Sequence, residues 1–171
     1  PRNVVLQLKR LQDNVKPFSK EQLDKIIAAE FKGKQEEIFK NIEYPPLGAA
    51  SIGQVHRAVL QDGREVVLKI QRPEVENLIR TDLSILAGLA TVLEGVIPEL
   101  RLLRPSIVVE ELKKSLFAEL DYFREATNTE RMRALFEGNA SIHIPEIIRE
   151  NSTRTVLCME FINGRKLTNL S

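Results

Sequence analysis

The residues best suited to chemistry in this sequence lie close together, between positions 46 and 69. A loop of small residues runs from Gly48 to Gly53, and Lys69 closes the second of two β-like runs that follow it. Consecutive backbone N–H groups in such a loop can cradle phosphates, because small side chains let the backbone approach a ligand closely. The pair Asp62-Gly63 separates the two β-like runs and predicts a hairpin. The stretch therefore predicts a phosphate-binding site.

The loop is close in pattern to the glycine-rich loop of protein kinases, G-x-G-x-x-G-x-V. Gly48, Gly53 and Val55 match this pattern, whereas Ala50 stands in place of the middle glycine. The second run ends in Val-Val-Leu followed by Lys69, and it resembles the kinase strand V-A-I-K, whose lysine binds the α- and β-phosphates of a nucleotide. A strand lysine can also lie on a solvent-exposed face. We prefer the functional interpretation because of the loop that precedes this lysine.

Three motifs in the same order resemble the UbiB/AarF family of atypical protein-kinase-like proteins. The first is an alanine-rich loop over residues 49–56, the second is LKIQRP over residues 68–73, and the third is ELDY over residues 119–122, followed by Glu125, Ala126 and Asn128. The resemblance covers nearly the whole chain. It implies an α+β fold, the N-lobe of a protein kinase, with a five-stranded antiparallel sheet, a helix C, and extra N-terminal and inserted helices.

The resemblance also implies which residues bind ATP. Lys69 and Glu125 would be the catalytic pair, with the Glu125 carboxylate holding the lysine. Backbone groups of Glu160 and Ile162 would face an adenine ring, and Met159 would line its back wall. The loop residues expected to contact the nucleotide are Gly48, Ala49, Ala50, Ser51, Ile52, Gly53 and Val55.

The polar residues near the third motif divide into two groups. At about 100° per residue, Asp121, Glu125 and Asn128 share one side of a helix, and Glu119 falls on the other side unless the helix bends. Glu119 and Asp121 resemble the E-x-D motif of the family, which is associated with a K-x-G-Q motif that covers the active site. No K-x-G-Q occurs in this sequence. We expect a regulatory role for the two acids, with two exposed helix acids as the alternative.

Composition excludes several other classes of protein. The 171 residues are 43% hydrophobic and 29% charged, which is typical of a folded domain, and the net charge of +1 gives no reason to expect nucleic-acid binding. The single cysteine, Cys158, excludes an intrachain disulfide, and we interpret it as inert core. His56 and His143 lack companions at ligand spacing, so we interpret both as structural and predict no protein metal site. We also expect no signal peptide or transmembrane segment within this sequence.

Hydrophobic periodicity and caps predict the other elements. Amphipathic helices are expected over residues 2–15 and after a capping box formed by Ser19 and Gln22, with further helical turns over residues 35–40. The other expected elements are a helix of about six turns over residues 73–97, one helix from Pro105 to near Gly138, and strands over residues 142–148 and 155–161. We divide the chain into a helical extension over residues 1–40, a kinase-like N-lobe over residues 41–164, and the start of a crossing to a C-lobe over residues 165–171.

The function implied by the resemblance is that of the nucleotide-binding part of an atypical kinase or ATPase. Intact family members would support ubiquinone or other isoprenoid-quinone lipid biology at a membrane surface in bacteria, mitochondria or plastids. Ligands for Mg²⁺ and a catalytic base are expected in the C-lobe, so this chain alone is not expected to be a complete enzyme. The alternative is a non-catalytic module that binds a lipid or a partner protein, with a vestigial nucleotide site. An exposed apolar stripe on the helix over residues 73–97 would favour that alternative. Apolar groups near residues 159–164 also predict self-association.

Overall fold

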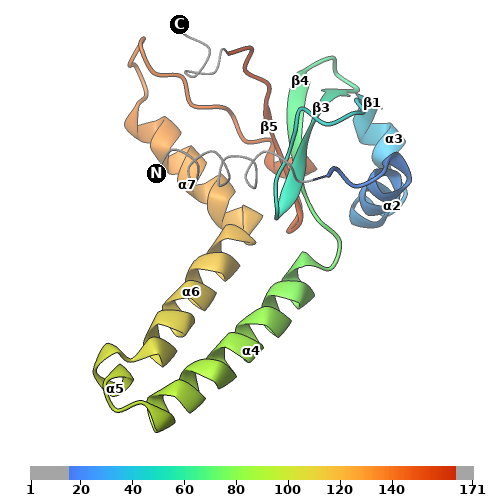
Figure 1. Ribbon diagram of the computed structural model, residues 1–171. Helices are drawn as coiled ribbons and strands as arrows, with labels where there is room; N and C mark the ends of the chain where they lie inside the picture. Colours follow the sequence, from blue (N-terminus) through green and yellow to red (C-terminus); the bar gives the residue numbers. More distant parts are fainter. Residues whose placement is uncertain (1–15, 165–171) are drawn as a thin grey trace, which may run out of the picture. The chain divides into compact units, whose positions relative to one another are not determined.

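The computed structural model describes residues 16–164 (Figure 1). The chain divides into two compact units, which are Pro1–Gln71 with Tyr122–Ser171, and Arg72–Asp121. The helix predicted over residues 2–15 and the crossing predicted over residues 165–171 lie outside the described residues. Each unit is therefore considered by itself.

The first unit is built on a five-stranded antiparallel sheet. Its strands are β1 (Phe39–Ile42), β2 (Gly48–Ala49), β3 (Gly53–Leu60), β4 (Glu65–Gln71) and β5 (Val156–Glu160). The strand order is β1-β3-β4-β5, with β2 pairing beside β3. This arrangement confirms the predicted α+β fold with a five-stranded antiparallel sheet.

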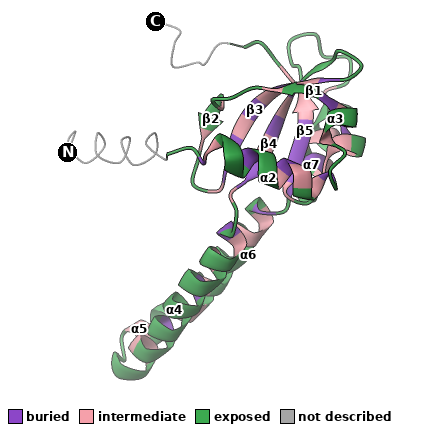
Figure 2. Cartoon of the chain, turned by 90° about the vertical axis from the view of Figure 1, so that its right-hand side faces the viewer, coloured by how far each residue is buried: buried purple, intermediate pink, exposed green. Residues whose placement is uncertain are grey.

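Helices cover the two faces of this sheet (Figure 1). The helices α2 (Lys20–Glu30) and α3 (Gln35–Ile38) lie on one side, and α7 (Tyr122–Leu135) lies on the other. The predicted capping box is present, since the Ser19 hydroxyl accepts from the Gln22 N–H and the Gln22 side chain accepts from the Ser19 N–H. Buried residues concentrate in the strands (Figure 2), and alternate positions of β4 contribute to different faces.

The apolar clusters on the two faces differ in size. The cluster beneath α2 is the main core, and its members are Phe18, Leu23, Ile27, Phe31, Phe39, Ala58, Leu60, Val66, Leu68, Ile70, Ile148, Val156 and Cys158. The cluster beneath α7 consists of Tyr122, Ala126, Ile147 and Leu157, with Met159 packed against it. The α7 face therefore retains polar side chains beside a small apolar base, and Lys69 is one of them.

One element predicted from the sequence ends earlier than expected in this unit, and another is wrong. The helical turns expected over residues 35–40 stop at Ile38, and Phe39 instead begins β1, where its ring packs edge-on against Phe31 at 5.1 Å. The strand expected over residues 142–148 does not form, and in that stretch only Ile147 makes a bridge, to Met159. Pro145 lacks the N–H group that a ladder requires, which limits pairing to the residues that follow it.

The second unit is helical. It contains α4 (Val75–Val96), α5 (Leu100–Leu103) and α6 (Pro105–Glu119). The predicted long helix is therefore present as α4. The turn after it is held by Arg101, which donates to the carbonyl oxygens of Glu94 and Gly95, and by the Glu94 carboxylate, which accepts from the Ser106 N–H at 2.8 Å. Within residues 16–164, no helix is long and apolar enough to cross a membrane.

The single helix predicted from Pro105 to near Gly138 is wrong, because the structure has two helices there. α6 ends at Glu119, and α7 begins at Tyr122. Leu120 closes α6 by donating its N–H to the carbonyls of Leu116 and Ala118. Asp121 then stands directly before the first residue of α7, where aspartate is favoured as an N-cap. The angular comparison of Glu119 with Asp121 and Glu125 along one helix therefore does not apply.

Candidate functional site

An ion pair joins the central strand of the sheet to α7. The Nζ atom of Lys69 on β4 lies 2.6 Å and 2.9 Å from the two carboxylate oxygens of Glu125 on α7. Both side chains remain about one-third exposed, 34% for Lys69 and 35% for Glu125, so the pair is accessible to a ligand. The geometry expected between these two residues is therefore present. Their catalytic role remains a prediction.

A tyrosine that the sequence analysis did not assign to the site packs against this lysine. The Nζ atom of Lys69 lies 4.9 Å from the centre of the Tyr122 ring, a cation–π distance. Burial raises the pKa of the Tyr122 hydroxyl well above its ordinary value, and the Glu125 carboxylate raises it further. Tyr122 lies three residues before Glu125 on α7, and this helical spacing is the signal that would have placed it on the same face.

The predicted phosphate loop is a tight hairpin. Gly48 and Ala49 form β2 and pair with Val55 and Gln54 on β3. The hairpin is closed by the Ala50 N–H, which donates to the carbonyl of Gly53 at 2.8 Å. That N–H group is therefore already engaged within the hairpin. A phosphate oxygen could accept a hydrogen bond from this N–H group only if the turn opened.

The two glycines of the loop differ in whether the packing around them excludes a side chain. A Cβ atom on Gly53 would overlap the carbonyl oxygen of Ile70 on β4, whereas a Cβ atom on Gly48 would meet nothing within 4 Å. Gly53 is therefore needed because β4 passes beside it. Gly48 has open space around it and neither glycine has a positive φ.

The residues predicted to face an adenine ring lie at the end of β5 and just beyond it. The N–H of Glu160 donates to the carbonyl of Glu146 at 2.8 Å, so of its two backbone groups only the carbonyl is left for a ligand. The carbonyl of Ile162 accepts from the Gly164 N–H at 2.9 Å, and the Ile162 side chain is 45% exposed. Met159 packs against the apolar cluster beneath α7. Contacts of these residues with adenine remain predictions.

The side chain of Glu160 is engaged by the segment that precedes η1 (Arg149–Asn151). Its carboxylate lies 3.0 Å from Nε2 of His143 and accepts from the Glu146 N–H at 3.1 Å. Burial opposes ionisation of the Glu160 carboxyl, but these hydrogen bonds hold its pKa below the ordinary value. The carboxylate therefore ties residues 143–146 to β5.

The remaining predicted residues belong to the second unit or have structural contacts. Glu119 ends α6 and Asp121 follows it, both in the second unit, and their regulatory role stays a prediction. His56 is buried, with its ring nitrogens 2.9 Å from the Glu43 carbonyl and from the Gln54 side-chain amide, and burial lowers its pKa. Burial raises the pKa of the Cys158 thiol to about 12. Both residues are part of the packed interior, as predicted.

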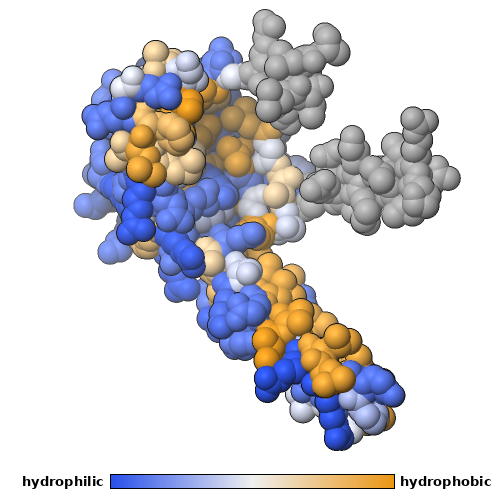
Figure 3. All heavy atoms as spheres, turned by 90° about the vertical axis from the view of Figure 1, so that its left-hand side faces the viewer, coloured by the Kyte–Doolittle hydropathy of each residue, from blue (hydrophilic) through white to orange (hydrophobic). Residues whose placement is uncertain are grey.

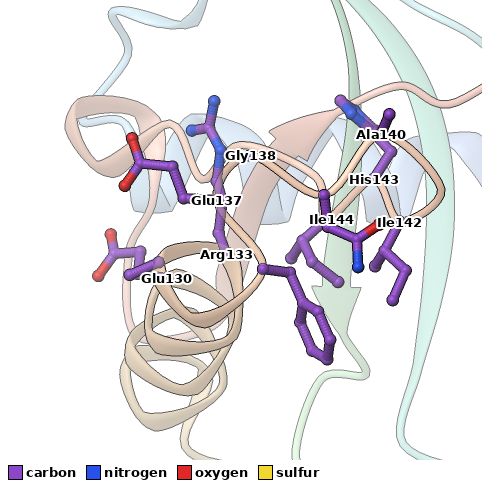
Figure 4. Close-up of a pocket in the computed structure, with 11 residues that line it drawn as sticks. Glu130, Arg133, Glu137, Gly138, Ala140, Ile142, His143 and Ile144 are labelled. Carbon is purple, nitrogen blue, oxygen red and sulfur yellow. The ribbon is translucent and has the colours of Figure 1, made fainter.

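A cavity lies at the C-terminal end of α7 in the first unit. It has a volume of about 650 Å³ and is lined by the C-terminal half of α7 and the segment after it, which includes Glu130, Arg133, Ile142 and Ile144 (Figure 4). None of the residues predicted to bind a nucleotide lines it. Among residues 16–164, no three or more His, Cys, Asp and Glu side chains are grouped as a metal ion would require.

Comparisons with known proteins agree with the fold and with the family that the motifs resemble. Residues 10–171 match the family model of the ABC1 atypical kinase-like domain. The chain is 38% identical over its whole length to a probable protein kinase UbiB of Cellvibrio japonicus, of which it covers 31%. It is 37% identical to the corresponding protein of Pseudomonas fluorescens, of which it covers 32%. The chain thus spans about a third of the length of these relatives.

One solved structure is also similar. It is that of Rv3197 from Mycobacterium tuberculosis in complex with erythromycin, which aligns with a TM-score of 0.76 and 29% identity. The match covers 95% of this chain and 39% of that protein. The family match spans nearly the whole chain. The chain belongs to the ABC1 atypical kinase-like family.

Proposed function

We propose that the first unit binds ATP together with Mg²⁺, as the nucleotide-binding part of an atypical kinase or ATPase. The observation that carries this proposal is the Lys69–Glu125 ion pair beside the hairpin of residues 48–55. A lysine held by a helix carboxylate is the arrangement that kinases use for the α- and β-phosphates. Membership of a kinase-like family also implies the use of a nucleotide.

Each residue has a distinct task in this proposal. Lys69 binds the phosphates as a point charge, and Glu125 keeps its ammonium directed along the sheet face when no phosphate is bound. The hairpin covers the phosphates, and the backbone carbonyl of Glu160 accepts from the adenine amino group. The ligands of Mg²⁺ and the catalytic base lie in a C-lobe, and the whole protein acts in isoprenoid-quinone lipid biology. These last assignments follow from resemblance to the family.

Titration calorimetry of the 171-residue chain with Mg-ATP tests the proposal directly. We expect saturable binding that weakens when Mg²⁺ is withheld, because the triphosphate then carries more negative charge than Lys69 alone can balance. A competing titration with ribose 5-phosphate, which lacks the polyphosphate, is the control. Absence of saturable binding in the chain, and also in a protein of the relatives' full length that carries it, would contradict the proposal.

Replacing Ala50 with glycine should raise the affinity for Mg-ATP. A Cβ at the middle of the loop limits the backbone conformations of residue 50, and glycine removes that limit. One added charge-assisted hydrogen bond is worth roughly 1.5–3 kcal/mol, or about ten- to a hundredfold in affinity, offset by about 0.5–1 kcal/mol for the freer glycine. The measurement is a calorimetric titration of both variants in a protein of the relatives' full length.

The existing contact of Ala50 provides the control for this prediction. Its N–H closes the hairpin onto Gly53, so a glycine that only loosened the turn would lower the melting temperature and leave affinity unchanged. Gly48→Ala adds a Cβ where there is open space and should leave the melting temperature unchanged. Equal affinities for the wild type and Ala50→Gly would mean that Ala50 is a packing residue.

A second candidate function rests on the surface of the helical unit. Hydrophobic atoms gather on the surface of the helical unit (Figure 3). The exposed apolar side chains there lie on α4, α5 and the start of α6, namely Leu78, Ile85, Leu86, Leu89, Val92, Val96, Leu102, Leu103, Ile107 and Val108. Leu102 is 88% exposed and Leu103 is 70% exposed, and Arg101 and Arg104 flank them. Apolar tips beside an arginine such as Arg104 suit the surface of a lipid bilayer, where the guanidinium reaches the headgroups. On this reading the unit would bind membrane lipid.

Vesicle co-sedimentation tests this second candidate. The 171-residue chain should sediment with phosphatidylcholine vesicles, and Leu102→Ser with Leu103→Ser should lower the bound fraction several-fold, because burying each leucine contributes about 1.5–3 kcal/mol. Leu135→Ser, at an 81% exposed leucine on α7, is the matched control and should not change the bound fraction. An unchanged bound fraction for the double variant would exclude the tip as a lipid anchor.

A further inference from the structure

Tyr122 has a position that the proposed site does not explain. It is the first residue of α7, its side chain has no exposed surface, and its ring packs with Ala126, Ile147 and Leu157. Its hydroxyl oxygen is buried and has no hydrogen-bond partner among the residues that the structure describes. Since most buried polar atoms in folded proteins are hydrogen-bonded, this hydroxyl needs a physical explanation.

Two parts of the candidate site meet at this side chain. The ring faces the ammonium of Lys69, whose Nζ lies 4.9 Å from the ring centre. The hydroxyl lies at Gly53, where a Cβ atom would be 3.1 Å from the hydroxyl oxygen. Gly53 ends the turn of the phosphate hairpin and starts β3. One side chain therefore contacts both the lysine and the last residue of the turn.

The hydroxyl is a hydrogen-bond donor at neutral pH. Burial and the carboxylate of Glu125 raise its pKa above the ordinary value, so it stays protonated there. A protonated phenol at the base of a phosphate loop offers a hydrogen bond to an acceptor. Leaving such a donor unpaired in the interior costs stability, and a ligand that supplies an acceptor restores that stability on binding.

We propose that Tyr122 is a positioning residue of the nucleotide site. Its ring fixes the Lys69 ammonium beside the hairpin. Its hydroxyl donates a hydrogen bond to a phosphate oxygen of the nucleotide when the turn over residues 50–52 moves to admit it. The inference rests on the nucleotide-binding function proposed above. It adds a role for Tyr122, which the third motif contains without a role, and a coupling between the hairpin and Lys69.

The variant Tyr122→Phe separates this role from a purely structural one. It removes the unpaired hydroxyl and keeps the ring. The melting temperature without nucleotide should therefore rise by about 2–4 °C, while affinity for Mg-ATP falls about tenfold. If Tyr122 had only a structural role, Tyr122→Phe would change stability and Mg-ATP affinity in the same direction or would change neither. Equal Mg-ATP affinities for the wild type and Tyr122→Phe would overturn the role of the hydroxyl.

The role of the ring has a readout that does not need a nucleotide. Protons on the ε-carbon of a lysine that lies over an aromatic ring are shifted upfield in NMR spectra. We expect this shift for Lys69 in the wild type and in Tyr122→Phe, and its loss in Tyr122→Leu, with the Lys69 signal assigned by Lys69→Arg. Phe123→Leu, at the half-exposed neighbour on α7, is the matched control and should retain the shift.

The outcomes distinguish this inference from the proposed function. If the wild type fails to bind Mg-ATP, the proposed function fails, and the ring shift still decides whether Tyr122 holds Lys69. If the wild type binds Mg-ATP but shows no ring shift at Lys69, the positioning role of the ring is wrong. If Tyr122→Leu does not fold, the wild type and Tyr122→Phe together still decide both parts.

Discussion

Replacing Lys69 with alanine is expected to weaken Mg-ATP binding about a hundredfold, because a charge-assisted contact is worth about 1.5–3 kcal/mol and the residual carboxylate adds repulsion. In the folded protein, removal of the ammonium leaves Glu125 as an uncompensated negative charge beside the position of the phosphates. Stability should change by only about 0–1 kcal/mol, because both partners are about one-third exposed and screened by water. Calorimetric titration and a thermal melt of the same sample measure the two effects.

The controls for this prediction come from the same chain. Lys40→Ala removes another strand lysine, an exposed one on β1, and should change neither affinity nor melting temperature. Glu125→Gln alone should weaken Mg-ATP binding less than Lys69→Ala does, since it keeps the Lys69 ammonium and removes only the ion pair that holds this ammonium in place. The double variant measures the coupling between the two residues. Wild-type affinity for Lys69→Ala would mean that the lysine only pairs with α7 and binds no phosphate.

Replacing Gly53 with alanine is expected to destabilise the first unit by about 3 kcal/mol, the upper end for adding a methyl group to a packed site. The added Cβ would overlap the carbonyl oxygen of Ile70, which is backbone in the central strand and cannot rotate away, and would press on the Tyr122 hydroxyl. The melting temperature should fall by roughly 6–12 °C. Differential scanning calorimetry of the variant measures the change.

Gly48→Ala is the matched control for this experiment, since both glycines belong to the same loop motif. No atom lies within 4 Å of the Cβ that it would add, and its φ is not positive, so its melting temperature should stay within about 1 °C of the wild type. If both variants are equally stable, the hairpin has moved to accommodate residue 53, and the packing argument for Gly53 is wrong. If both are equally destabilised, the loop needs glycine for its backbone freedom.

Local patterns in the sequence were sufficient to predict much of the secondary structure of this protein. The capping box at Ser19 depends on residues three positions apart, and the hairpin around Asp62-Gly63 depends on two adjacent strands. The long helix α4 follows from the spacing of its own apolar residues. Such elements are readable because the interactions that form them join residues close in sequence. The order of three such motifs was also sufficient to indicate the family, and with it the pairing of Lys69 with Glu125.

Only the tertiary structure shows which residues pack around the Lys69–Glu125 ion pair. Lys69 and Glu125 are 56 residues apart, and the ring of Tyr122, the first residue of α7, lies beneath the Lys69 ammonium. The requirement for Gly53 comes from β4 passing beside it. Residues 142–148 do not pair as a strand, because Pro145 has no N–H group to donate; of these residues only Ile147 forms a bridge, to Met159 on β5. These features depend on contacts between segments distant in the chain, and helical or strand periodicity carries no information about which distant segment will pack there.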